Sequence, residues 1–323
     1  MKNFDRQPGT NLDFMIRMLH KPPFYFLVFV FVILVSCDKF DGEQEVPSYI
    51  SIDTIGFSSE YSDEGTDKQR ITDAWVYVND QLVGGFEIPF TAPVLNRGEV
   101  KLEIRPGIIL NGISETRAPY PYFAPIIIND FSLEQGEVAG INDLSTVYRD
   151  NTEFVWREEF EDEAFAIVKG PEGEVDIART SPPGSSEAFT DENSEYSGVA
   201  VLGSDNSRMV LQSDDGNDGG FELRKGNFIF LELHYKTELP LITGLFINQQ
   251  NQFIQKRPFV GLNPTDEWKK VYINFTPLVN EEVGAVDFRV YFEANASEGQ
   301  AGSKIYLDNI KLLSRQNLKL SDE

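Results

Sequence analysis

The chain has 323 residues, enough for two domains of ordinary size, and carries 52 acidic against 28 basic residues, a formal net charge of −24. A surface this acidic repels phosphate backbones, which excludes a nucleic-acid partner. The single cysteine excludes an intramolecular disulfide and a zinc site built from several thiolates.

The first predicted element is an apolar segment at residues 24–35, preceded by Lys21 and followed by Cys37. A spanning helix needs about 20 apolar residues, so this shorter run favours the hydrophobic region of a signal peptide. A short membrane anchor or a buried strand is the alternative. Residues 34–37, Leu-Val-Ser-Cys, resemble the lipobox of bacterial lipoproteins. The resemblance implies removal of residues 1–36 as a signal peptide and lipidation of Cys37, which would anchor the mature chain to a membrane.

Residues 37–46 are predicted to form an acidic tether. Asp38, Asp41, Glu43 and Glu45 resemble the acidic export signal that directs Bacteroidota lipoproteins to the cell surface. A linker that only keeps this segment solvated is the alternative. With the lipobox, the resemblance implies a lipid-anchored protein of the outer membrane, exposed at the cell surface.

Residues 47–145 are predicted to form a small β-sandwich. Asn79-Asp80 separates the β-type runs 74–78 and 81–84, and both residue types accept the left-handed backbone of a two-residue hairpin. A further strand at residues 99–104 alternates clearly and stops at a Pro-Gly pair. The stretch 75–107 resembles Ig-like or PEGA-like modules, which implies an Ig-like β-sandwich.

An aromatic loop follows at residues 117–125, where three prolines flank Tyr120, Tyr122 and Phe123. Rigid exposed aromatic rings can form a contact surface for a partner or a sugar. The alternative is a loop folded back over the edge of the sandwich.

Residues 150–315 are predicted to form a second domain, in which residues 158–313 show only β-type patterns, and residues 316–323 are predicted to form a tail. Apolar residues occupy every second position in the runs 229–235, 271–275 and 288–292. Such alternation places one face of each strand in a core and the other in water, so we expect a two-sheet sandwich.

Part of this region resembles the galactose-binding-like jelly rolls of carbohydrate-binding modules. The most specific element is Tyr-Leu-Asp-Asn-Ile at residues 306–310, which in that superfamily lies in the strand closing the sandwich. The resemblance implies an all-β chain with an N-terminal Ig-like sandwich followed by a C-terminal jelly-roll β-sandwich. The other matching segments are residues 158–161, 266–273 and 288–293, and the remainder of 304–312.

The closing strand is predicted to contain a bulge. Ile305 and Leu307 have one parity and Ile310 and Leu312 the other, so burying all four requires an extra residue near 308–309.

In the resembling jelly rolls, a structural Ca²⁺ often joins an acid of the first strand to the Asp of the last. By position, the resemblance implies Glu159, Glu161 and Asp308 as metal ligands. An Asx turn that satisfies the bulge without a metal is the alternative.

The polar faces of the strands are the predicted ligand-binding surface, because sugar recognition combines aromatic rings with polar groups. An ordinary solvated sheet face is the alternative. The candidate ligand-binding residues are Tyr272, Asn274, Arg289, Tyr291 and His234.

No catalytic residue is predicted. His234 is the only histidine after the signal peptide, and no Gly-x-Ser-x-Gly motif accompanies it. Glu174 and Asp176 resemble the start of a Glu-x-Asp-x-x-Glu glycosidase strand, but Arg179 stands where the second glutamate is needed.

We therefore expect a non-enzymatic, lipid-anchored outer-membrane lipoprotein that binds a glycan or scaffolds an envelope complex. An accessory subunit of an outer-membrane uptake, secretion or assembly machine is the alternative. A glycoside hydrolase-like enzyme is the third. Structural Ca²⁺ is the only cofactor expected.

Overall fold

The computed structural model describes residues 46–216, 220–250 and 253–315. Contacts divide the chain into Met1–Val46 and one compact unit, Pro47–Glu323. The predicted signal peptide, Cys37, nearly all of the tether and the C-terminal tail lie outside the described residues. No helix in the described ranges is both long and apolar enough to cross a membrane.

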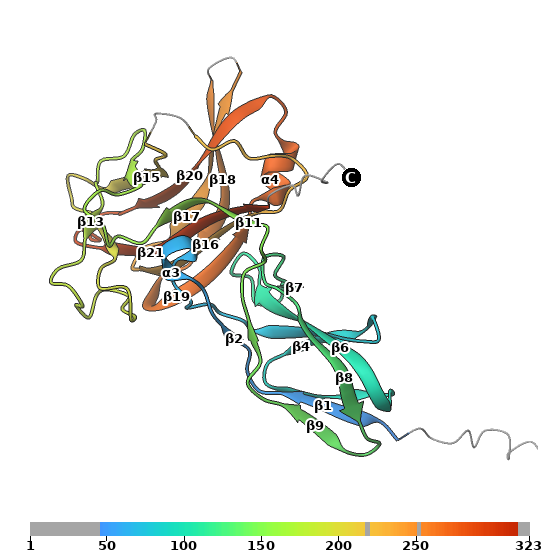
Figure 1. Ribbon diagram of the computed structural model, residues 1–323. Coiled ribbons are helices and arrows are strands. Elements are labelled where there is room, and N and C mark those ends of the chain that lie inside the picture. The colour runs from blue at the N-terminus through green and yellow to red at the C-terminus, as the bar shows by residue number, and fades with distance from the viewer. Residues whose placement is uncertain (1–45, 217–219, 251–252, 316–323) are drawn as a thin grey trace, which may run out of the picture. The chain divides into compact units, whose positions relative to one another are not determined.

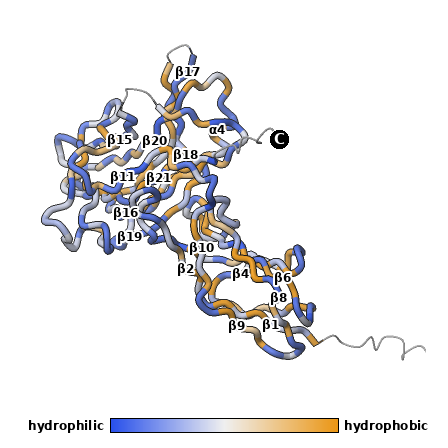
Figure 2. Tube along the Cα trace, in the orientation of Figure 1, coloured by the Kyte–Doolittle hydropathy of each residue, from blue (hydrophilic) through white to orange (hydrophobic). Residues whose placement is uncertain are grey.

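The described chain is all-β, as predicted: its helices are two short ones, α3 (Tyr61–Glu64) and α4 (Thr276–Glu281) (Figure 1). Many of the hydrophobic stretches run along strands, as the orange segments near β1 and β9 show (Figure 2). Strands with one apolar face bury it by packing sheet against sheet.

The first sandwich packs a three-stranded sheet, in the order β5-β1-β9, against a five-stranded sheet of β4-β3-β6-β7 with β8 beside β6. Its core contains Ile50 and Ile52 from one sheet and Val76, Leu102 and Ile104 from the other. A small third sheet pairs β2 with β10. The bounds are β1 (Ser48–Ile52), β2 (Gly56–Phe57), β3 (Asp73–Val78), β4 (Gln81–Glu87), β5 (Phe90–Val94), β6 (Gly98–Ile109), β7 (Arg117–Pro119), β8 (Ile126–Leu133), β9 (Val138–Ile141) and β10 (Ser145–Thr146).

The hairpin predicted at Asn79-Asp80 is confirmed. Both residues connect β3 to β4 with positive φ, 49° and 65°. Asn and Asp tolerate this left-handed backbone better than other side chains, which explains their place in the turn.

The second sandwich packs a six-stranded sheet against a five-stranded sheet. The six-stranded sheet has the order β13-β14-β21-β16-β19, with β11 also paired to β21, and the five-stranded sheet has the order β12-β15-β20-β17-β18. The bounds are β11 (Thr152–Glu158), β12 (Ile167–Lys169), β13 (Ala178–Arg179), β14 (Gly198–Val201), β15 (Arg208–Ser213), β16 (Ile229–Thr237), β17 (Leu241–Gln249), β18 (Ile254–Leu262), β19 (Thr265–Asn274), β20 (Ala285–Asn295) and β21 (Lys304–Arg315).

The bulge predicted in the closing strand is confirmed. Along β21 the register with β16 shifts between the pairs Glu232↔Lys311 and His234↔Asp308, and Asn309 has a positive φ of 49°. The extra residue restores the alternation of the strand. The four aliphatic side chains on either side of the bulge are therefore all fully buried in one core: Ile305, Leu307, Ile310 and Leu312.

The prediction that the opposite faces of these strands lie in water is wrong. Phe230, Glu232 and His234 on β16 are all buried, and so are Tyr272 on β19 and Tyr291 on β20. Alternation along one strand reveals its two faces, but it does not show what covers the second face.

The aromatic loop supplies part of that cover. Tyr120, Tyr122 and Phe123 pack with Phe230 and Tyr272 in a hydrophobic cluster separate from the two sandwich cores. The rings therefore do not form an exposed contact surface. The predicted domain boundary falls between β10 and β11, and independent folding of the two predicted domains stays a prediction.

Candidate functional site

A pocket of about 270 Å³ lies beside β19. We call it the edge pocket, because β19 is the last strand of the six-stranded sheet. Ligand pockets usually measure about 300–1,000 Å³, so this one suits a small ligand such as one sugar unit. It is lined by Arg70, Ile109, Asn111, Gly112, Ser114, Tyr235, Gly261, Leu262, Asn263, Lys269, Lys270, Val271 and Tyr272.

The loop after β6 forms one side of the edge pocket. Leu110 bridges to Tyr272 in parallel, the Asn111 amide donates to the Tyr272 carbonyl at 2.8 Å, and the Asn274 amide donates to Asn111 Oδ1 at 2.8 Å. Backbone groups of alternate residues point to the same edge of a strand. The amide and carbonyl of Lys270, two residues before Tyr272, therefore face the same edge as the pocket.

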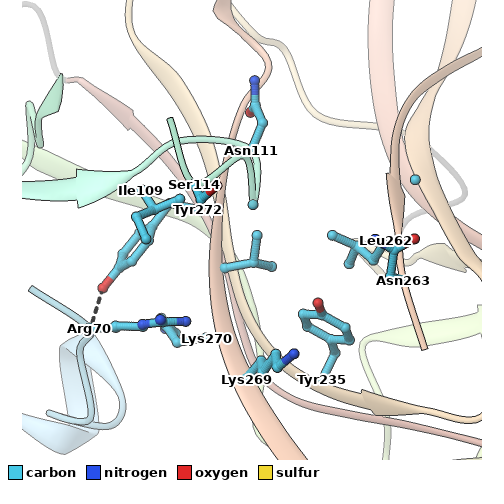
Figure 3. Close-up of a pocket in the computed structure, with 13 residues that line it drawn as sticks. Arg70, Ile109, Asn111, Ser114, Tyr235, Leu262, Asn263, Lys269, Lys270 and Tyr272 are labelled. Atoms are coloured by element: carbon cyan, nitrogen blue, oxygen red, sulfur yellow. Dashed lines mark hydrogen bonds between the residues drawn. The ribbon is translucent and has the colours of Figure 1, made fainter. Parts of the chain in front are cut away.

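The pocket joins apolar and polar walls. Leu262 and Val271 are buried members of the sandwich core. Figure 3 shows the Tyr235 hydroxyl directed into the space near Leu262. Asn263 and Ser114 add neutral polar groups to the lining. This is the mixture of apolar contact and few polar groups by which small ligands are recognised.

A neighbouring segment is fixed to the pocket through Tyr272. The Arg70 amide donates to the Tyr272 hydroxyl at 2.8 Å (dashed in Figure 3), and that hydroxyl donates to Gln69 Oε1 at 2.8 Å. These bonds place the Arg70 side chain at the pocket.

Behind the pocket wall lies a buried ion pair. Lys270 Nζ is 3.1 Å from Glu232 Oε2, and the two side chains are 3% and 0% exposed. Burial raises the pKa of Glu232, but Lys270 and Lys311 more than offset this and hold that pKa below its ordinary value. Glu232 is therefore ionised.

Tyrosines from the first half of the chain complete this network. Tyr120 donates to Glu232 Oε1 at 2.7 Å and Tyr148 donates to Oε2 at 2.9 Å. Burial, and next the Glu232 charge, raise the pKa of both phenols well above the ordinary value, so both remain donors. The role of Glu232 could not be predicted from the sequence, because an acid on the polar face of a strand is normally exposed to solvent.

Lys311 is the second lysine beside Glu232. Its ammonium donates to the Thr66 carbonyl at 2.9 Å and to the Tyr148 hydroxyl at 3.4 Å. Burial, and next the charge of Lys270, lower its pKa to about 7. Lys311 is thus a buried group that titrates near neutral pH.

The structure does not gather the five predicted ligand residues on one surface. His234 lies on β16 and Tyr272 and Asn274 on β19, whereas Arg289 and Tyr291 lie on β20 of the other sheet. Only Tyr272 lines the edge pocket. Ligand binding by the other four stays a prediction.

Two of these residues are enclosed by aromatic rings. His234 stacks on Phe189 at 4.2 Å between centroids, and burial lowers its pKa well below the ordinary value. Tyr291 packs against Phe246 at 4.7 Å, and Lys256 Nζ lies 4.8 Å from its ring centroid. The Tyr291 hydroxyl is buried without a hydrogen-bond partner. Neither side chain is available to a sugar as placed.

Of the three predicted metal ligands, Glu161 and Asp308 accept hydrogen bonds from protein donors, and Glu159 has an oxygen without a hydrogen-bond partner. Glu161 Oε1 accepts three hydrogen bonds, from Ser194 Oγ and the Glu195 and Tyr196 amides. Asp308 accepts from Ser197 Oγ at 2.6 Å and from its neighbouring amide. Within the described ranges, no group of three or more His, Cys, Asp or Glu side chains is arranged to hold a metal.

Three donors already occupy Glu161 Oε1 and one donor occupies each oxygen of Asp308, so a calcium ion at these three residues would have to share or displace protein donors. Glu159 Oε1 is buried and makes no hydrogen bond. Burial raises the pKa of both Glu159 and Asp308. Calcium binding stays a prediction of the sequence.

The glycosidase-like acids have structural partners. Glu174 Oε2 accepts from the Ser207 and Arg208 amides, and Asp176 pairs with Lys169 at 3.0 Å. No Asp or Glu lines the edge pocket. The pocket therefore lacks the pair of carboxylates that glycoside hydrolysis ordinarily uses.

Comparison with protein families finds no matching family model, and no curated protein matches the sequence. Several solved structures are similar to part of the chain. One is the enzymatically active domain of bacteriophage CBA120 tailspike protein 4, at 10% identity and a TM-score of 0.33, covering 50% of this chain and 19% of that one.

Two further similar structures are carbohydrate-binding modules. The CBM22-1 xylan-binding domain from Paenibacillus barcinonensis matches at 11% identity and a TM-score of 0.34, covering 52% of this chain and 99% of that one. TmCBM61, solved in complex with β-1,4-galactotriose, matches at 16% identity and a TM-score of 0.29, covering 49% and 91%. TM-scores this low carry no functional argument.

Proposed function

We propose that the protein is a non-enzymatic, lipid-anchored envelope protein that binds a glycan in the edge pocket. The observation that carries the proposal is the composition of the pocket lining. It combines the apolar side chains of Leu262 and Val271 with the polar groups of Tyr235, Asn263 and Ser114. The apolar side chains suit the C–H face of a sugar ring, and the polar groups suit its hydroxyls.

The rigidity of the walls supports binding with little reorganisation. The loop side is fixed to β19 by the backbone bridge between Leu110 and Tyr272 and by the Asn111 side chain, which accepts from the Asn274 amide. The Arg70 segment is fixed through Tyr272. A preformed pocket avoids the entropic cost of ordering its residues when a ligand binds.

A glycan array tests the proposal, with Ser114→Trp as the variant that fills the pocket. Ser114 is exposed on the loop after β6, so the larger side chain costs little stability. The matched control is Ser132→Trp, at an exposed position on β8. We expect wild type and Ser132→Trp to bind the same glycans and Ser114→Trp to lose them at unchanged Tm. An empty array, or equal binding by both variants, contradicts the proposal.

The lipid anchor rests on the lipobox-like residues alone. Intact-mass analysis of the protein purified from membranes tests it directly. We expect a mature chain that begins at an acylated Cys37, and an unmodified residue 37 behind an uncleaved N-terminus contradicts the anchor.

A further inference from the structure

The edge pocket is positively charged in a strongly acidic protein. Three cations, Arg70, Lys269 and Lys270, line it, and no carboxylate does. The whole chain carries a net charge of −24. A strongly acidic surface repels anions in general. A local cluster of cations on such a protein is therefore a feature that needs a specific explanation.

Two of the three charges are not neutralised by the protein. The positive charge of Lys270 is neutralised by Glu232, with which it forms the buried ion pair. Arg70 and Lys269 are exposed, and within the described ranges neither is paired with any carboxylate. The pocket therefore holds an excess of about two positive charges.

The charged and apolar walls lie on different sides. Figure 3 shows Lys270 beside Arg70, Lys269 beside Tyr235, and Leu262 on another side of the pocket. A ring placed against Leu262 and Val271 can thus direct a charged substituent to Arg70 and Lys269 while its hydroxyls meet Tyr235, Asn263 or Ser114. Guanidinium and ammonium groups form charge-assisted hydrogen bonds to carboxylates.

We propose that the edge pocket selects an acidic saccharide, whose sugar-ring carboxylate is bound by Arg70 and Lys269. The inference rests on the proposed function and narrows it to uronic acids and other carboxylated sugars. A neutral sugar would leave both cations without a partner, so it would gain only the contacts with the apolar wall and the neutral polar groups.

Titration calorimetry on the full chain in detergent tests the selection. The probes are the carboxylated members of a glycan array, each compared with its own methyl ester, which keeps the ring and linkage but removes the charge. We expect Kd to rise at least about tenfold on esterification and to rise with added salt. Arg70→Gln and Lys269→Met should each raise Kd for the acid several-fold and leave Kd for the ester unchanged.

Arg97→Gln and Lys225→Met are the matched controls, since both residues are exposed and outside the pocket. Both should bind like wild type. Equal Kd for acid and ester overturns the acidic-saccharide inference and leaves glycan binding intact. Binding restricted to phosphorylated or sulfated sugars also overturns it. If no saccharide binds at all, both the inference and the proposed function fail.

Discussion

The ammonium of Lys270 lies 3.1 Å from the carboxylate of Glu232, and both side chains are almost fully buried. Lys270 lines the edge pocket, whereas Glu232 also accepts hydrogen bonds from Tyr120 and Tyr148. One ion pair thus connects the pocket wall to residues from the first half of the chain.

Glu232→Gln should destabilise the protein strongly. The change leaves Lys270 and Lys311 buried without their counter-charge, and breaking a buried pair in this way costs about 3–5 kcal/mol. Chemical denaturation measures it, with Glu267→Gln, an exposed acid on β19, as control. The control should stay within about 0.5 kcal/mol of wild type. A loss below about 1 kcal/mol in Glu232→Gln contradicts a buried ionised pair.

Adding Lys270→Met to Glu232→Gln should recover part of that loss, because the second change removes one of the uncompensated charges. The resulting double-mutant cycle gives the coupling of the pair. Strictly additive losses would show that the two side chains do not interact.

The stability of the protein should rise with pH between about 7 and 9. The pKa of Lys311 is about 7 in the folded chain, whereas an unfolded lysine has its ordinary value near 10.4. In this window the unfolded state holds the extra proton, so raising the pH favours folding, by about 2 kcal/mol from this group. The groups facing it are Glu232, Lys270, Glu159 and Arg157.

Denaturant unfolding midpoints measured between pH 7 and 9 test whether Lys311 causes this pH dependence of stability. Lys311→Met should flatten the slope, and Lys225→Met, which removes an exposed lysine, should keep it. A slope that survives Lys311→Met assigns the titration to another group.

Tyr291→Phe should leave the free energy of unfolding unchanged or raise it by up to about 1 kcal/mol, because the removed hydroxyl is buried without a partner. Tyr120→Phe makes the same chemical change but removes a bond to the charged Glu232, so it should cost about 1.5–3 kcal/mol. Thermal and denaturant unfolding of the two variants side by side compare them. Equal destabilisation would mean that the Tyr291 hydroxyl has a partner.

Chelation should leave Tm unchanged. Protein donors already occupy Glu161 Oε1 and both oxygens of Asp308. The calcium site that the sequence predicts requires the opposite, a lower Tm in EDTA that excess Ca²⁺ restores. Calorimetric scans in EDTA and in CaCl₂ distinguish the two, and Glu161→Gln shows whether any shift arises at this residue.

Features set by local spacing could be predicted from the sequence. The Asn79-Asp80 turn follows from two adjacent residue types, and the bulge at 308–309 follows from a change of parity within one strand. Both depend on residues a few positions apart.

Two features could not be predicted from the sequence: which side chains cover the second faces of the sheets, and the edge pocket. Tyr120 and Glu232 are 112 positions apart, and Arg70 and Tyr272 are 202 apart. Such contacts depend on how distant segments pack, which alternation along a single strand does not encode. Three of the five predicted ligand residues, His234, Tyr272 and Tyr291, lie on faces that the fold buries, and of the five only Tyr272 lines the edge pocket.

A crystal structure of residues 47–323 with a saccharide identified on the array tests the central claim most directly. We predict the sugar ring in the edge pocket, against Leu262 and within hydrogen-bond distance of the Tyr235 hydroxyl, with its carboxylate at Arg70 or Lys269. A sugar bound instead on the outer face of β20 beside Tyr291, with the edge pocket filled only by solvent, would contradict the account.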